Sequence, residues 1–176
     1  MKKPFGLLPD PAGLNGLVMF LFLSYYFGPK TLSDGDTFFH IRFGQIMLER
    51  GQILREDLFS HTAAGQPWLA HEWLSEIIMA LFYDSGGLAG LTLFFFLVTA
   101  LTFTLLFQTA RRYSNDWIAF VVIVLAAAPM ATTHLLARPH LFTWLLGAIT
   151  LHLLVCNDRR LWLLPLLTLV WANLHG

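Results

Sequence analysis

Residues 88–109, LAGLTLFFFLVTALTFTLLFQT, form an apolar run without a charged side chain. A helix needs about 20 such residues to cross a bilayer. Comparable runs occupy 12–29, 117–136, 141–156 and 161–174, the last two being somewhat short. Because lipid satisfies no backbone hydrogen bonds, each run is predicted to be helical. The pattern predicts about five transmembrane helices.

The composition of the whole chain agrees with a membrane protein. Of 176 residues, 56% are hydrophobic and 12% are charged, whereas soluble domains have about 25% charged residues. The formal net charge is zero, which argues against nucleic acid as a partner. We therefore predict a single all-α integral membrane module in contact with membrane lipids.

The positions of basic residues predict its orientation. Lys2 and Lys3 precede the first run, and no signal-peptide cleavage site follows, so the first helix is interpreted as a retained anchor with a cytoplasmic N-terminus. The arginine pairs 111–112 and 159–160 then fall in cytoplasmic loops, as the positive-inside rule requires. We expect a bacterial inner membrane protein with segment 30–87 on the outer face.

Segment 30–87 is predicted to contain two amphipathic helices that lie in the membrane surface, at 36–50 and 71–83. Residues 51–70 between them are interpreted as an ordered loop. Helical spacing puts one apolar set on each helix: Phe39, Phe43, Ile46 and Met47 on the first, and Trp73, Leu74, Ile77, Ile78 and Leu81 on the second. The opposite face of the second helix carries His71, Glu72, Ser75 and Glu76.

The acidic junction 33–40, SDGDTFFH, admits two interpretations. Ser33 and Asp36 have the spacing of a capping box, and acids in a first helical turn are favoured by the helix dipole. A carboxylate can also act as a general base. Asp34 and Asp36 could bind Mg²⁺ or Mn²⁺, which prefer oxygen ligands. The two roles are compatible, and the residues alone do not decide between them.

Three further groups of polar residues are predicted on the outer side. His71-Glu72 lacks the second histidine of the zinc-protease pattern H-E-x-x-H, because Ser75 stands there. Glu76 is interpreted as part of a hydrated helix face, whereas His71 and Glu72 are candidates for a site. In Arg138-Pro139-His140, the proline could simply end one helix and start the next, or the arginine could bind a phosphate. His175 could belong to a polar helix end or to the same site.

This order of elements resembles the start of the type-C glycosyltransferases, membrane enzymes that take a sugar from a polyprenyl-phosphate carrier. The residues that carry the resemblance are 34–40 and 71–74. Together with 57–60 (DLFS) and 171–176 (WANLHG), they also resemble the N-terminal part of a bacterial multi-span family whose activity is inferred.

The resemblance implies sugar transfer on the outer face from a polyprenyl-phosphate-linked donor. Asp36 would be the general base, with Asp34 orienting it or binding a cation, and Arg138 would bind the donor phosphate. The other expected substrate-binding residues are His40, His71, Glu72, His140 and His175.

Enzymes of this type usually have more membrane spans than the sequence contains. We therefore expect residues 1–176 to be the N-terminal module of a longer protein, or to work with a partner subunit that supplies the remaining spans. The alternative is a non-catalytic membrane subunit or scaffold, in which the acids and histidines only solvate a loop. A transporter is less favoured, because His152 is the one ionisable residue expected near the middle of a span.

Overall fold

The computed structural model describes residues 11–28, 30–113, 134–156 and 159–175. In these ranges the regular structure is helical, and extended pairing is confined to an isolated bridge between Glu56 and Pro67. The all-α prediction is confirmed. The elements are α1 (Pro11–Phe27), η1 (Lys30–Leu32), α2 (Gly35–Arg50), α3 (Trp73–Ala110), α5 (His140–Val155), η2 (Arg159–Leu163) and α6 (Leu164–Leu174).

These boundaries agree closely with the predicted helices at 12–29, 36–50, 141–156 and 161–174. The predicted span 117–136 lies almost entirely outside the described residues. Among the described helices, α3 alone is both long and apolar enough to cross a membrane, whereas α1 and α5 are shorter apolar helices. The number of spans stays a prediction.

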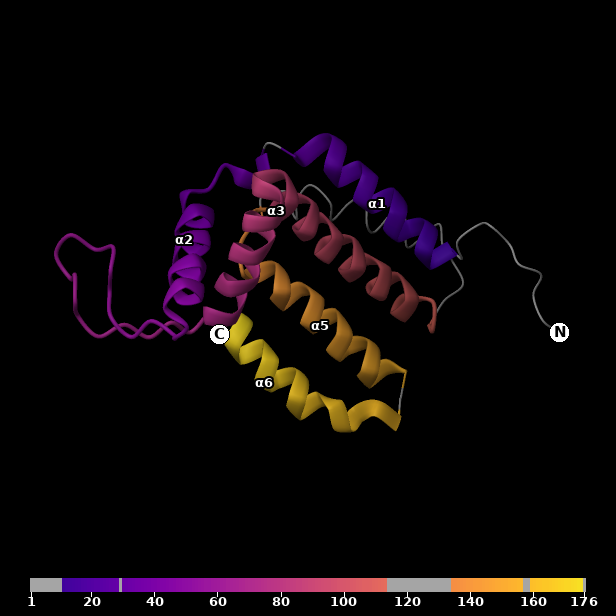
Figure 1. Cartoon of the computed structure of the whole chain (residues 1–176). Helices are drawn as coiled ribbons and strands as arrows, with labels where there is room; N and C mark the ends of the chain where they lie inside the picture. Colours follow the sequence, from indigo (N-terminus) through magenta and orange to yellow (C-terminus); the bar gives the residue numbers. More distant parts are fainter. Residues whose placement is uncertain (1–10, 29, 114–133, 157–158, 176) are drawn as a thin grey trace.

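Helix α3 joins the predicted surface helix 71–83 to the predicted span 88–109. Gly87 interrupts it with a left-handed backbone, φ 60° and ψ −157°. Glycine adopts positive φ without a steric penalty because it has no Cβ. The chain therefore bends here, and the two parts of α3 take different directions (Figure 1).

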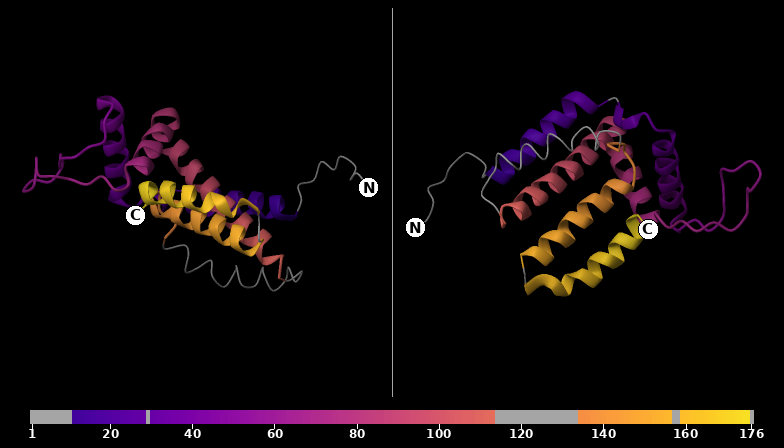
Figure 2. Two further views of the ribbon diagram at one scale, coloured as in Figure 1. Left: turned by 90° about the horizontal axis from the view of Figure 1, so that it is seen from below. Right: turned by 180° about the vertical axis from the view of Figure 1, so that it is seen from behind.

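Four segments run side by side in the order α1, the C-terminal part of α3, α5 and α6 (Figures 1 and 2). Their core includes Leu91, Phe95 and Phe142, all buried. The C-terminal end of α6 lies near the beginning of α3 (Figure 1). This arrangement brings the end of the described chain back to segment 30–87.

Helix α2 packs against the N-terminal part of α3. Phe43 and Met47 are buried there, with Trp73 and Ile77 packed against their cluster. The closest approach is at Gly44, where a Cβ would lie 1.9 Å from the backbone oxygen of Glu76. The apolar face of α2, which we predicted to lie in the membrane surface, instead contacts protein, because α3 supplies a matching apolar surface.

The loop 51–70 is ordered, as predicted. It begins at Gly51, whose φ of 64° ends α2. One carboxylate oxygen of Asp57 accepts from the backbone N–H groups of Phe59 and Ser60, each at 2.9 Å. Hydrogen bonds from the Ser60 side chain and from these two N–H groups lower the pKa of Asp57.

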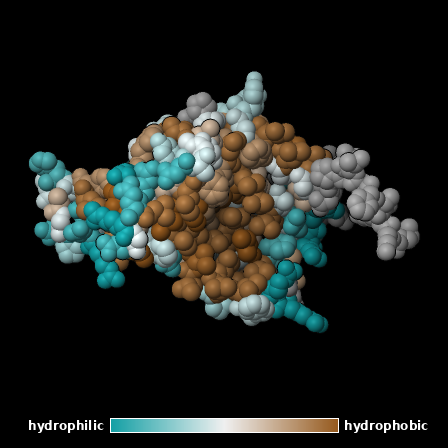
Figure 3. All heavy atoms as spheres, viewed as in Figure 1, coloured by the Kyte–Doolittle hydropathy of each residue, from teal (hydrophilic) through white to brown (hydrophobic). Residues whose placement is uncertain are grey.

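Large apolar side chains are exposed over the four-segment layer. Figure 3 shows a continuous hydrophobic area over its centre, with hydrophilic residues toward its two ends. Contiguous apolar surface of this kind is unusual on a soluble monomer and marks contact with lipid or another protein. The exposed large apolar side chains of these four segments include Leu17, Val18, Leu21, Leu93, Leu97, Leu101, Leu151, Leu154, Leu166 and Leu169.

Candidate functional site

A pocket of about 220 Å³ lies where α2, the start of α3, the turn before α5 and the end of α6 meet. Five of the six predicted substrate-binding residues are on its wall. The lining residues are His40, Glu72, His134, Leu136, Arg138, Pro139, His140 and His175. Residues separated by more than a hundred positions are thus brought to one place.

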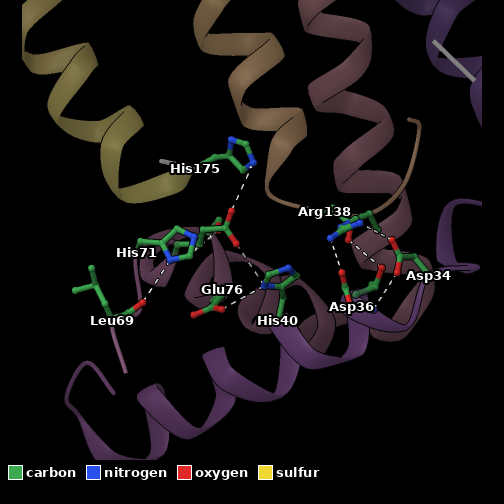
Figure 4. Close-up of polar contacts among 12 residues, drawn as sticks. Asp34, Asp36, His40, Leu69, His71, Glu76, Arg138 and His175 are labelled. Carbon is green, nitrogen blue, oxygen red and sulfur yellow. Dashed lines mark hydrogen bonds and ion pairs between the residues drawn. The ribbon is translucent and has the colours of Figure 1, made fainter. Parts of the chain in front are cut away.

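Arg138 pairs with both aspartates of the acidic junction, and we call these three residues the ion-pair side of the pocket (Figure 4). One guanidinium nitrogen, Nη1, donates to Asp34 at 2.9 Å, and Nη2 donates to Asp36. Arg138 is half-buried, whereas the Asp36 side chain is 56% exposed. The guanidinium therefore joins the junction before α2 to the turn before α5.

Asp34 is also the N-cap of α2. Its Oδ1 accepts from the backbone N–H of Asp36 at 3.0 Å. Ser33, the cap residue of the predicted capping box, instead donates its hydroxyl to the Lys30 carbonyl at 2.7 Å. Of the two interpretations of the junction, the cap is therefore present at Asp34, one residue after the Ser33 of the capping-box spacing, because Ser33 closes the preceding 3-10 turn that ends at Leu32.

Two threonines that the sequence analysis missed position the turn before α5. The Thr37 hydroxyl donates to the Ala137 carbonyl at 3.1 Å, and the Ala137 N–H donates to the Thr31 carbonyl at 2.9 Å. Thr31 and Thr37 are both buried. No local pattern marks either residue, because their partners lie about a hundred positions away.

We call His40, Glu72, Glu76 and His175 the histidine side of the pocket (Figure 4). Nδ1 of His40 lies 3.2 Å from Glu76 Oε1 and 3.9 Å from Glu72 Oε2. His175 Nε2 lies 3.5 Å from Glu72 Oε1. These four residues thus form a connected series of imidazoles and carboxylates.

The prediction that Glu76 belongs to a hydrated face was wrong, since only 4% of the residue is exposed. The cause is the packing of α2 against α3. Gly44 lets α2 approach α3 closely at Glu76, and His40, one helical turn earlier on α2, then covers the carboxylate.

The end of α6 is attached to the rest of the site by side-chain hydrogen bonds. His175 Nδ1 and the indole N–H of Trp171 both lie 2.9 Å from the Thr143 hydroxyl of α5. The Trp73 indole N–H donates to Asn173 at 2.6 Å. These contacts fix His175 on the pocket wall.

Two histidines differ from expectation. His71 is exposed, with Nδ1 3.3 Å from the Leu69 carbonyl, and it is not among the lining residues (Figure 4). His134, which was not predicted, lines the pocket, and its carbonyl accepts from His140 Nε2 at 2.7 Å. Only its position three residues before the Ala137–His140 turn could have indicated it.

His140 precedes the apolar run 141–156, and burial lowers its pKa below the usual 6.5. The hydrogen bond to His134 acts in the opposite direction, and the positive charge of Arg138 adds to the lowering. Because its partner is a carbonyl oxygen, Nε2 of His140 is the donor, and the bond braces the turn that carries Arg138.

The residues present do not fit a bound Mg²⁺ or Mn²⁺. Asp34 and Asp36 already pair with a guanidinium, with which a cation would compete. Among the residues that the structure describes, no three His, Cys, Asp or Glu side chains are arranged to bind a metal.

Comparison with known proteins leaves the resemblance as a hypothesis: no family profile, curated protein or solved structure matches this chain.

Proposed function

We propose that this chain is a membrane module that binds a polyprenyl-phosphate-linked sugar at its outer face and transfers the sugar to an acceptor. The observation that carries the proposal is the presence of Arg138 and four histidines on the wall of one pocket, beside two aspartates. The pocket lies at the end of an apolar helical layer, where a lipid phosphate would meet a hydrophilic site.

Membrane insertion is supported by the exposed apolar side chains of the layer. Helix α1 has 17 residues, which at 1.5 Å per residue is about 25 Å, somewhat less than the roughly 30 Å of a hydrocarbon core. The arginine pairs 111–112 and 159–160 follow α3 and α5 at the ends of the layer opposite the pocket. This distribution agrees with a cytoplasmic location for those ends.

Arg138 is the proposed ligand of the donor phosphate. A guanidinium has five N–H donors and can bind two oxygens of a planar or tetrahedral anion at once. Asp34 and Asp36 accept hydrogen bonds from some of these N–H donors and hold the guanidinium at the pocket wall. The N-terminus of α5 at His140 adds the positive end of a helix dipole on the same wall.

The proposed reaction is displacement at the anomeric carbon of the sugar, with the polyprenyl phosphate as leaving group. Such a step needs a base for the acceptor hydroxyl. The resemblance gives that role to Asp36, whose exposed side chain is accessible but also accepts from Arg138. The role of Asp36 stays a hypothesis.

One observation favours the alternative of a non-catalytic module. Asp34, Asp36, Glu72 and Glu76 outnumber Arg138 in and beside the pocket, and Arg138 joins two distant segments as a structural ion pair would. In that case Arg138 would stabilise the fold without binding phosphate.

The two functions are separated by exchanging Arg138 for Gln in the longest natural form of the chain, reconstituted in nanodiscs. The control is Arg50→Gln, because Arg50 also pairs with an acid, Glu56 at 3.7 Å, but does not line the pocket. We expect Arg138→Gln to weaken polyprenyl phosphate binding about tenfold or more, as for loss of a charge-assisted contact, and the control to bind normally. Equal binding by wild type and both variants would refute the phosphate site.

A further inference from the structure

The imidazole of His40 and the carboxylate of Glu76 form a buried pair that the sequence did not predict. Only 9% of the His40 side chain and 6% of the Glu76 side chain are exposed. Their atoms Nδ1 and Oε1 are 3.2 Å apart, within hydrogen-bonding distance. Of the two residues, His40 lines the pocket.

The pair determines which ring nitrogen carries the proton. A carboxylate oxygen accepts hydrogen bonds, so the contact with Glu76 favours the His40 tautomer in which Nδ1 is the donor. The other nitrogen, Nε2, makes no hydrogen bond with any described residue, and the ring lines the pocket. In the neutral ring, Nε2 therefore has a lone pair available to a bound molecule.

Glu76, more than Glu72, is the residue that orients the ring. Glu72 lies 3.9 Å from Nδ1, too far for a hydrogen bond, and is closer to His175 at 3.5 Å. The second oxygen of Glu76, Oε2, is buried and has no partner among the described residues. A buried oxygen without a partner is energetically costly and calls for an explanation, so it marks a candidate functional position.

We propose that His40, positioned by Glu76, is the proton acceptor of the pocket in the sugar transfer described above, on which this inference rests. The acceptor hydroxyl gives its proton to His40 Nε2 while its oxygen forms a bond to the anomeric carbon. The bond between that carbon and the phosphate oxygen breaks, and its electron pair leaves with the polyprenyl phosphate. Glu76 keeps the proton on Nδ1 and balances the charge that forms on the ring.

This assignment gives Asp36 a different role. Its carboxylate accepts from Arg138, so it helps to position the guanidinium that binds the donor. Exchanging Asp36 for Asn should then raise the KM for the donor more than it lowers kcat. Exchanging His40 for Gln should lower kcat more than it raises the KM for the donor.

The tautomer is measured by NMR of the full chain labelled with ring-¹⁵N histidine. The signals of His40 are assigned as those that disappear in the variant His40→Gln. We expect the neutral wild-type ring to carry its proton on Nδ1. Glu76→Gln, which retains an oxygen acceptor, should keep this tautomer, and Glu76→Leu should lose it. The matched control is Glu72→Gln, which should leave it unchanged. A wild-type proton on Nε2 would overturn the inference without any assay of activity.

The kinetic test uses the same variants with a polyprenyl-phosphate sugar. We expect His40→Gln to lower kcat by about 100- to 10,000-fold, the usual loss for a general base. Glu76→Leu should lower kcat in the same direction, with partial recovery in Glu76→Gln. If wild type transfers sugar and His40→Gln does so at the same rate, this inference alone is wrong. If wild type transfers nothing, the proposed function fails, and the role of His40 fails with it.

Discussion

Both sides of the pocket pair carboxylates with basic side chains, but the two sides differ in their exposure to solvent. The ion-pair side is partly exposed: the side chains of Arg138 and Asp36 are 36% and 56% accessible. The histidine side is buried around His40 and Glu76. Exposed ion pairs contribute little to stability, about 0–1 kcal/mol, whereas buried polar groups are costly to leave unpaired. We infer that the ion-pair side serves binding and that the histidine side serves proton transfer.

The largest expected effect is on the helix crossing that buries the histidine side. Gly44→Ala would place a Cβ 1.9 Å from the Glu76 backbone oxygen, so α2 must move away from α3. Overpacking of this kind costs about 1–3 kcal/mol. We expect a lower thermal unfolding midpoint and faster proteolysis of the loop 51–70.

The control is Gly35→Ala, where a Cβ would meet no atom within 4 Å. If Gly44→Ala unfolds at the wild-type temperature, the close crossing is not present in solution, and the comparison of the two sides loses its basis.

A smaller loss is expected where Thr37 connects the ion-pair side to the turn before α5. Thr37→Val removes the hydrogen bond to the Ala137 carbonyl and leaves that buried oxygen without its donor. The expected cost is about 1 kcal/mol. Thr168→Val is the matched control, because the Thr168 hydroxyl donates to a carbonyl of its own exposed helix. Equal unfolding midpoints for both variants would show that Thr37 does not hold the turn.

Exchanges of the acidic junction should change stability least. At an N-cap Asn is about as good as Asp, so Asp34→Asn should cost well under the roughly 1 kcal/mol of a deleted cap. Asp36→Asn should likewise unfold near the wild-type temperature, while donor affinity falls. A large loss of stability in either variant would mean that the ion-pair side is structural.

Asp57, which belongs to neither side of the pocket, offers a test of how the stability of the loop 51–70 depends on pH. Its pKa is lowered from 3.8 in the folded loop, so its stabilising contribution is fully present above that value. The contribution is lost as the pH falls through the lower, folded pKa. We expect proteolysis of the loop 51–70 to accelerate under acid, and Asp57→Asn to remove much of that pH dependence. If cleavage of the loop depends on acid to the same extent in wild type and in Asp57→Asn, this explanation is wrong.

Helix positions were predictable because each depends on a local pattern. The apolar runs gave α1 and α5, and the stripe at Phe39, Phe43 and Ile46 gave α2. The gathering of Arg138 and His175 with the outer loop followed from the alternation of helices across a membrane. Five of the six predicted substrate-binding residues do line one pocket, whereas their roles and the membrane crossing stay predictions.

The errors concern features that depend on contacts between distant residues. Glu76 is buried because α2 approaches it at Gly44, and Thr37 matters because of Ala137. His134 lines the pocket because the turn folds back onto His140. Neither periodicity nor composition contains this information.

The most direct test of the central claim is a transfer assay with the longest natural form of the chain in a bilayer and a labelled polyprenyl-phosphate sugar. We predict that wild type releases polyprenyl phosphate and forms a glycosylated acceptor, and that His40→Gln binds the donor with near wild-type affinity but transfers at least about 100-fold more slowly. Transfer by His40→Gln at the wild-type rate, or no transfer by wild type with a range of donor sugars, would contradict the account.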